Sequence, residues 1–227
     1  MQDINNHQRV NDILLGPIER PALRWLSAHL PAWVTPDACT AIGVLGALIT
    51  LVSYVLSGTD RDFLWLASFG FVVNWFGDSL DGNLARFRRI ERPAYGFYVD
   101  HTTDALSQTM IFLGLGLTPY VSFAAASLAL IAYLMLSVLA YVQTCVTGEF
   151  KISYGRLGPT EIRALAILLN TTMYAFGLRT FGSILWLELG LEISAYDVFV
   201  GAIALLLFGF FLSTFWRHVR LLSVSRS

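Results

Sequence analysis

Charged residues are scarce in this sequence. Only 14% of its 227 residues are Asp, Glu, Lys or Arg, against roughly 25% in soluble domains, while 56% are hydrophobic. This shortage argues against a soluble domain, and we expect most of the chain to lie in lipid. The net charge is only −1, so the overall balance gives no support for a nucleic-acid partner.

Cysteine is also rare. Cys39 and Cys145 lie in apolar runs without the spacing of a metal site, so we expect two small buried hydrophobic residues and no disulfide framework. The first 37 residues contain no apolar stretch of signal-peptide length. No cleaved secretory signal is therefore expected, and the mature chain should begin at or near Met1.

Long uncharged stretches predict six transmembrane helices, since a helix needs about 20 mostly apolar residues to cross the hydrocarbon core. The stretch 105–147 is too long for one crossing and should break at the Gly-Leu-Thr-Pro sequence of residues 116–119. The expected spans are residues 38–56, 63–77, the two halves of 105–147, 164–178 and 198–216. The sequence thus predicts an all-α, polytopic membrane protein.

An amphipathic helix in the membrane interface is expected before the first span. Apolar residues alternate there with polar ones, as such a helix requires. Its apolar residues are Val10, Ile13, Leu14, Ile18, Leu23 and Leu26. We expect Pro17 and Pro21 to break this helix into pieces. Short connectors favour one membrane domain over 1–227, with an interfacial segment 1–37, a six-helix bundle 38–216 and a cytoplasmic tail 217–227.

Basic residues divide unequally between the two sides of a six-span arrangement. One side receives both termini and the second and fourth loops, with all but two of the 15 Lys and Arg residues. The other side keeps only Arg61 and Arg179. Because cytoplasmic segments are enriched in Lys and Arg, both termini and these two loops are predicted to face the cytoplasm.

Four carboxylates converge at this predicted cytoplasmic boundary. Asp78 and Asp81 end the second span, and Asp100 and Asp104 begin the third. Residues three or four apart share a helix face, so the two pairs are expected to oppose each other across a short loop. Each acid at membrane depth costs roughly 2.5 to 3.5 kcal/mol, a cost that bound cations would offset. Carboxylate oxygens suit Mg²⁺ or Mn²⁺, with substrate phosphates completing the shell.

Small residues and one arginine share these two faces: Gly82, Ala85, Arg86 and Gly96. With the carboxylates they form Asp-x2-Asp-Gly-x2-Ala-Arg, a spacer, then Gly-x3-Asp-x3-Asp. This pattern resembles the signature of the CDP-alcohol phosphotransferases, with all eight positions filled within 27 residues. One departure precedes the first span, where the family commonly shows Pro-Asn-x2-Thr and this chain has Asp37 after Pro36.

The resemblance implies a membrane transferase of the EC 2.7.8 type that serves phospholipid biosynthesis. It implies transfer of a phospho-alcohol group from a CDP-linked donor to an acceptor hydroxyl, with release of CMP, and a homodimer. The implied metal ligands, for two ions of Mg²⁺ or Mn²⁺, are Asp78, Asp81, Asp100 and Asp104. The implied CDP-binding residues are Asp78, Asp81, Gly82, Ala85, Arg86 and Gly96. In-line attack on a diphosphate needs this kind of charge neutralisation.

Two residues are candidates for the catalytic base. The family pattern assigns the role to Asp104, while the Asp100-His101 pair resembles the choline and ethanolamine phosphotransferase branch, in which the histidine is a candidate. An imidazole ionises nearer neutral pH than a metal-bound carboxylate. We therefore expect His101 to assist proton removal and Asp104 mainly to complete the metal shell.

The acceptor is left open by the sequence. Residues 158–161, Gly-Pro-Thr-Glu, resemble a Gly-Pro-x-Glu segment of the same branch, which favours a lipid alcohol such as diacylglycerol. A nearby basic cluster instead suits a phosphorylated acceptor. The alternative is thus a CDP-diacylglycerol-dependent phosphatidyltransferase acting on inositol phosphate, glycerol phosphate or serine. Candidate acceptor-binding residues are Lys151, Arg156, Glu161 and Arg163.

Two other classes also use intramembrane carboxylates. Membrane prenyltransferases place their two acidic motifs on distant helices, whereas one short loop separates the pairs here. A divalent cation transporter would explain the carboxylates, since intramembrane acids often mark ion pathways. It would leave the positions of Gly82, Ala85 and Arg86 unexplained.

Overall fold

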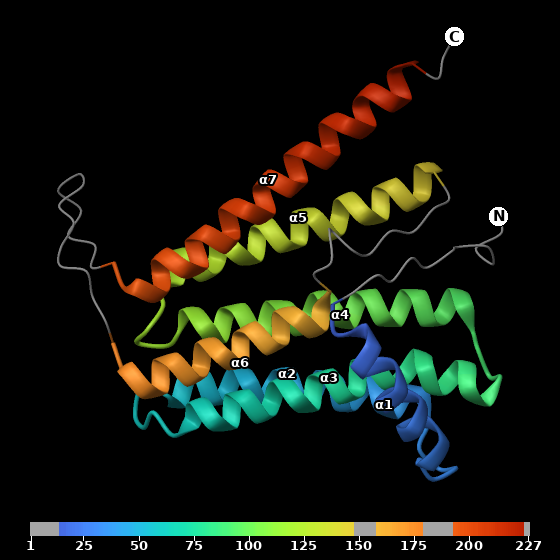
Figure 1. Cartoon of the computed structure of the whole chain (residues 1–227), viewed down its shortest axis with the longest axis horizontal. Helices are drawn as coiled ribbons and strands as arrows, with labels where there is room; N and C mark the ends of the chain where they lie inside the picture. Colours follow the sequence, from blue (N-terminus) through green and yellow to red (C-terminus); the bar gives the residue numbers. More distant parts are fainter. Residues whose placement is uncertain (1–13, 148–157, 179–192, 225–227) are drawn as a thin grey trace.

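The computed structural model describes residues 14–147, 158–178 and 193–224, and seven α-helices make up its regular structure (Figure 1). Six long helices follow one shorter N-terminal helix. The helices are α1 (Gly16–His29), α2 (Pro36–Leu56), α3 (Phe63–Arg88), α4 (Pro93–Gly116), α5 (Phe123–Thr147), α6 (Pro159–Phe176) and α7 (Ala195–Val224). The all-α prediction is confirmed for these residues.

Four of the helices, α2, α3, α5 and α7, are long and apolar enough to cross a membrane. The other two long helices carry more polar residues. Asp100, His101 and Asp104 lie in the first half of α4, and Glu161 and Arg163 lie in the first turns of α6. Six crossings therefore remain a prediction, while four helices of membrane-spanning length and hydropathy are present.

The predicted break in the long uncharged stretch is confirmed. Helix α4 ends at Gly116 and α5 begins at Phe123. Thr118 organises the turn, because its Oγ1 donates to the Leu115 carbonyl at 2.7 Å and accepts from the backbone N–H groups of Tyr120 and Val121 at 3.3 Å. Proline at 119 cannot donate a backbone hydrogen bond, which favours ending the helix here.

Helices α2 and α3 pack so closely that glycine is required at their crossing. A Cβ atom built on Gly46 would lie 2.8 Å from the Cα atom of Asn74, and one on Gly77 would overlap the backbone N of Gly43. Small residues at such a crossing let two helix backbones approach within a membrane. The α2–α3 pair is therefore the dense centre of the bundle, against which α1, α4 and α6 pack.

Buried polar side chains join three helices within this bundle. The Tyr54 hydroxyl of α2 donates to Asn170 Oδ1 of α6 at 2.8 Å, and Asn170 Nδ2 donates to Ser68 Oγ of α3 at 3.1 Å.

The two cysteines differ in burial. Cys39 is buried as predicted, but the same prediction for Cys145 is wrong. Its side chain is exposed because it lies near the end of α5, on a side that no described helix covers.

Helix α1 is continuous, so the predicted break at Pro17 and Pro21 is wrong. Pro17 lies in the first turn, where a backbone N–H has no helical partner to lose, and Pro21 removes a single hydrogen bond. Leu23 packs with Leu80 and Leu84 of α3, while Trp25 on another side of α1 is exposed. The location of α1 in a membrane interface remains a prediction.

Arg88 fixes the connector between α1 and α2. Its Nη1 donates to the carbonyls of Val34 at 2.5 Å and Ala32 at 3.4 Å, and its Nη2 donates to those of Pro31 at 2.9 Å and Leu30 at 3.1 Å. These carbonyls follow the end of α1, where helical partners are lacking. The last turn of α3 therefore holds the N-terminal segment in place.

Candidate active site

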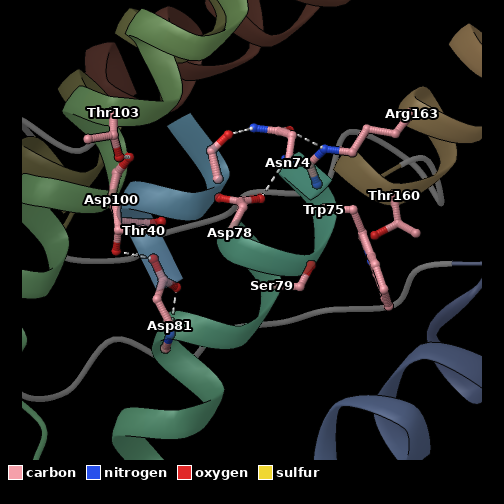
Figure 2. A network of polar contacts seen from close by, with 12 residues as sticks. Thr40, Asn74, Trp75, Asp78, Ser79, Asp81, Asp100, Thr103, Thr160 and Arg163 are labelled. Carbon is pink, nitrogen blue, oxygen red and sulfur yellow. Dashed lines mark hydrogen bonds and ion pairs between the residues drawn. The ribbon is translucent and has the colours of Figure 1, made fainter. Parts of the chain in front are cut away.

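Three of the four predicted carboxylates meet between α3 and α4. One oxygen each of Asp78, Asp100 and Asp104 lies within 4.8 Å of the others. Asp78 stands on α3 and Asp100 on α4 (Figure 2), and Asp104 lies one helical turn after Asp100. The facing of the two helices that the spacing predicts is thus present, with the three side chains half-buried.

Asp81 is bound differently from the other three. Its Oδ2 accepts a hydrogen bond from Thr40 Oγ1 of α2 at 2.7 Å, and its Oδ1 accepts from the backbone N–H of Gly82 at 2.5 Å. It stands outside the compact group of three but on the same side of α3, one turn beyond Asp78. Its role as a metal ligand stays a prediction.

A buried arginine from α6 contacts Asp78. Arg163 Nη2 donates to Asp78 Oδ2 at 2.6 Å, and Arg163 Nε donates to Asn74 Oδ1 at 2.8 Å. Asn74 in turn donates from Nδ2 to the Gly43 carbonyl at 2.9 Å, linking α6, α3 and α2 (Figure 2). Arg163 is only 6% exposed, and its Nη1 has no hydrogen-bond partner among the described residues.

The cluster suits a divalent cation. Its donors are carboxylate oxygens, which are the ligands that Mg²⁺ and Mn²⁺ prefer. The Arg163 guanidinium pairs with Asp78, and the His101 imidazole lies beside Asp100. A small cleft beside Asp78 and Asp104 is lined by residues of α2, α3 and α4, among them Thr40, Asn74 and Ser107.

The His101 ring is held by aromatic side chains. It stacks on Tyr141 of α5 with centroids 5.1 Å apart, and it lies edge-on to Phe97 at 4.2 Å. Its Nδ1 atom lies 3.5 Å from Asp100 Oδ2, and its side chain is 13% exposed. The imidazole therefore lies beside the carboxylate cluster, on the helix that carries Asp100 and Asp104.

The residues predicted to bind CDP lie beyond the carboxylates, toward the α3–α4 connector. Gly82, Ala85 and Arg86 continue the exposed side of α3, and Gly96 lies in the first turn of α4. A Cβ on Gly96 would meet no atom within 4 Å, and one on Gly82 would lie 3.4 Å from the Arg86 guanidinium. Gly96 thus borders open space, whereas Gly82 lies against the Arg86 side chain.

Two predicted acceptor-binding residues, Lys151 and Arg156, lie outside the described residues. Glu161 is buried and caps α6, since its Oε2 accepts from the Gly158 N–H at 2.9 Å and its Oε1 from the Leu15 N–H at 2.7 Å. Arg163 is the member of this set that reaches the carboxylates. The described part of the proposed acceptor set therefore has one capping residue and one residue at the site.

Several contacts were missed by the sequence interpretation. Asn74 lies four residues before Asp78 in an apolar span, a spacing that could have marked it as part of the same face. Asp37, the departure from the family pattern, receives Arg92 Nη2 at 2.8 Å from both of its oxygens. The hydrogen bond to Asp37 raises the pKa of Arg92 above its usual value. Nothing in the sequence pairs these two residues.

Comparison with known proteins gives a consistent family match. The profile of the family described as CDP-alcohol phosphatidyltransferase matches residues 33–194. The chain is 29% identical over 203 residues to Cholinephosphotransferase 1 of Danio rerio, covering 84% of this chain and 50% of that protein. It is 27% identical over 208 residues to Cholinephosphotransferase 1 of Homo sapiens, covering 84% of this chain and 48% of that protein.

A bacterial relative matches a shorter region. Phosphatidylinositol phosphate synthase of Cutibacterium acnes is 36% identical over 91 residues, which cover 40% of this chain and 41% of that protein. The chain spans about half the length of the two cholinephosphotransferases.

Proposed function

Because the chain belongs to the CDP-alcohol phosphatidyltransferase family, we propose that it moves a phospho-alcohol group from a CDP-linked donor to an acceptor hydroxyl and releases CMP. The observation that carries this proposal is the meeting of Asp78, Asp100 and Asp104 within 4.8 Å. Three carboxylates within two largely apolar helices are costly unless cations neutralise them. Family membership implies what those cations would bind, namely the diphosphate of the CDP-linked donor.

The four aspartates would hold two ions of Mg²⁺ or Mn²⁺. Such ions supply neutralisation of the diphosphate and of the departing CMP. Asp81, positioned by Thr40, would complete the ligand set from its place one turn along α3. Gly82, Ala85, Arg86 and Gly96 would receive the cytidine nucleotide, a role supported by the open space beside Gly96.

His101 would accept the proton of the attacking hydroxyl, with Asp104 completing the metal shell. Its stacking on Tyr141 and its edge-on contact with Phe97 hold the ring beside Asp100. A general base must lie within hydrogen-bond reach of the proton that it accepts, and the position of the imidazole beside the carboxylates supports this role.

Two acceptor classes remain in competition. The names of the two cholinephosphotransferases and the Gly-Pro-x-Glu segment favour a lipid alcohol such as diacylglycerol. The buried Arg163, whose Nη1 lacks a partner among the described residues, favours an anion such as the phosphate of inositol phosphate or glycerol phosphate. The second class would make the chain a CDP-diacylglycerol-dependent phosphatidyltransferase.

The deciding experiment measures CMP release by purified protein in lipid. CDP-choline or CDP-ethanolamine with diacylglycerol is compared with CDP-diacylglycerol plus inositol phosphate, glycerol phosphate or serine. Activity should require Mg²⁺ or Mn²⁺, and Asp78→Asn, Asp81→Asn and Asp100→Asn should each reduce it to background. Full turnover in excess chelator would contradict the metal assignment. Uptake of Mn²⁺ into protein-containing vesicles without CMP release from any pair would instead support a cation transporter.

The catalytic face should lie in the cytoplasm, with both termini. This orientation is supported by the unequal division of basic residues between the two sides. An impermeant thiol reagent should therefore fail to label a cysteine introduced at Arg89 in intact cells.

A homodimer is also proposed, since only 17% of the most apolar stretch of α7 is buried within the chain. Cross-linking in membranes tests whether a second copy or lipid covers that surface.

A further inference from the structure

Glu19 of α1 joins three helices through one oxygen atom. Its Oε1 accepts hydrogen bonds from Trp75 Nε1 at 2.9 Å, Ser79 Oγ at 3.2 Å and Thr160 Oγ1 at 2.8 Å. Trp75 and Ser79 stand on α3, and Thr160 stands at the start of α6 (Figure 2). We call these four residues the Glu19 cluster. The sequence offered no sign of it, since Glu19 was read as part of an interfacial helix.

The Glu19 cluster is adjacent along two helices to Asp78 and to its partner Arg163. On α3, Trp75 is three residues before Asp78 and Ser79 is the residue after it. On α6, Thr160 is three residues before Arg163, whose guanidinium contacts Asp78. A closed path thus runs from Glu19 through α3 to Asp78, across to Arg163, and back through α6 to Glu19. The relative position of α3 and α6 at this level depends on both contacts.

Helix α1 is itself fixed on either side of Glu19. The Leu15 N–H, just before the helix, donates to Glu161 Oε1 of α6 at 2.7 Å. After the helix, Arg88 of α3 binds four carbonyls of the connector. The Glu19 carboxylate therefore projects from an anchored element, as a group that positions others must.

Simple attachment of α1 would not need a carboxylate. The Leu23 contacts and the Arg88 contacts already dock this helix. Removing a carboxylate partly from water is unfavourable, and three donors on one oxygen offset that loss because hydrogen bonds to an ionised acceptor are stronger than neutral ones. The Glu19 carboxylate thus accepts strong hydrogen bonds from α3 and α6, the two helices that are joined by the Asp78–Arg163 contact.

We propose that Glu19 is a positioning residue for the metal-binding carboxylates: it holds α3 and α6 in the register at which Arg163 orients Asp78. The proposal rests on the function proposed above. Partners behind metal ligands, when removed, typically change metal affinity or activity about 10-fold to 100-fold. Glu19 acts one step further away, so the lower end of that range is expected.

The test compares Glu19→Leu, which removes the acceptor at similar size, with Glu19→Gln, which keeps an acceptor oxygen. The apparent dissociation constant for Mn²⁺ is measured on purified protein without substrate, together with kcat, KM and the thermal unfolding midpoint. Glu19→Leu should weaken Mn²⁺ binding about 10-fold and lower kcat with little change in the KM for the donor. Glu19→Gln should stay within about 3-fold of the parent protein, and the exposed control Glu91→Leu should match the parent.

Variants that each remove one hydrogen-bond donor to Glu19 keep the proposal testable if Glu19→Leu does not fold. Thr160→Val and Ser79→Ala each remove one hydrogen bond to Glu19 and should weaken Mn²⁺ binding about 2-fold to 3-fold. A lower unfolding midpoint with unchanged Mn²⁺ affinity in all these variants would overturn the proposal and leave Glu19 as a docking residue. An equal loss in Glu19→Gln and Glu19→Leu would overturn the role of the acceptor oxygen.

Failure of this inference and failure of the proposed function give different results. Because the Mn²⁺ titration needs no turnover, it tests Glu19 even if no donor and acceptor pair releases CMP. A parent protein that releases CMP beside Glu19 variants with parental affinity and kcat would overturn the role of Glu19 alone.

Discussion

The glycines of α2 and α3 differ sharply from those at the α3–α4 connector. At the crossing, a Cβ on Gly46 or Gly77 would overlap the backbone of the facing helix. Near the connector, a Cβ on Gly96 would meet no atom within 4 Å, and one on Gly82 would meet the flexible Arg86 side chain at 3.4 Å. The first pair lets two helices touch, while Gly96 leaves space that the described chain does not fill. One residue type thus serves the fold in one region and, on our proposal, the substrate in the other.

The difference shows which part of the molecule should tolerate change. The α2–α3 crossing has no space for a larger side chain, so substitutions there should impair folding. The connector region has space in the folded chain, so substitutions there should impair only nucleotide binding. Four substitutions test this division.

The largest effect is expected from Gly77→Val. The new side chain would overlap the backbone N of Gly43 and the Cys39 carbonyl, and neither can move without separating α2 from α3. We expect no monodisperse protein after extraction in detergent, as judged by size-exclusion chromatography. Gly201→Val on α7 is the matched control, because a Cβ there meets nothing within 4 Å. Normal behaviour of Gly77→Val would show that the crossing is looser than described.

His101→Ala should be next in size and should act on chemistry alone. Loss of a general base lowers rates by about 100-fold to 10,000-fold. Rapid-mixing measurement of CMP formation should detect this loss, while Mn²⁺ and CDP affinities stay near the parental values. His29→Ala, at an exposed site on α1, provides the control. Undiminished turnover in His101→Ala would return the role of base to Asp104.

Gly96→Ala should leave the fold intact and weaken donor binding. Its Cβ has open space in the chain, so the unfolding midpoint should equal that of the parent. A methyl group that meets the nucleotide should raise the KM for the donor about 10-fold, the effect of roughly 1.4 kcal/mol. Gly58→Ala, whose Cβ would lie 3.7 Å from the Val55 carbonyl at the other end of α2, is the control. An unchanged KM would remove Gly96 from the nucleotide site.

Tyr54→Phe should produce the smallest effect. It deletes the hydroxyl that donates to Asn170 Oδ1, with no change in packing volume at the crossing. The loss of one buried hydrogen bond should lower the free energy of unfolding by about 0.5 to 1.5 kcal/mol. Reversible unfolding in mixed detergent measures it, with the exposed Tyr98→Phe as the control. A change in kcat without a change in stability would contradict a purely structural role.

The sequence allowed prediction of features that repeat along a helix. Helical class, the break near Gly116 and the meeting of Asp78 with Asp100 and Asp104 follow from apolar length, turn residues and three- or four-residue spacing. The helix that contains the apolar stretch 63–77 continues to Arg88, with its polar residues still helical. Polarity ends a membrane span but need not end a helix.

Contacts between distant segments could not be predicted in this way. Arg163 and Asp78 are 85 positions apart, and Glu19 and Thr160 are 141 apart. Spacing along one helix says nothing about which residue of another helix it meets. Charge alone did not indicate burial either, since Arg163 of the predicted basic cluster is buried beside Asp78. Depth in the bundle is set by helix packing, which one sequence does not reveal.

Arg88 and Arg92 belong to the basic residues used to orient the chain, and both are engaged within the protein. Arg88 binds connector carbonyls, and Arg92 binds Asp37. Topology is decided while the chain enters the bilayer, before these partners are in place and while both charges still face water. On the predicted orientation, each arginine would act twice, first by keeping its segment on the cytoplasmic side during insertion and later by binding these partners in the folded chain. Replacing Arg88 by lysine would preserve the first action and weaken the second, because lysine lacks the forked guanidinium.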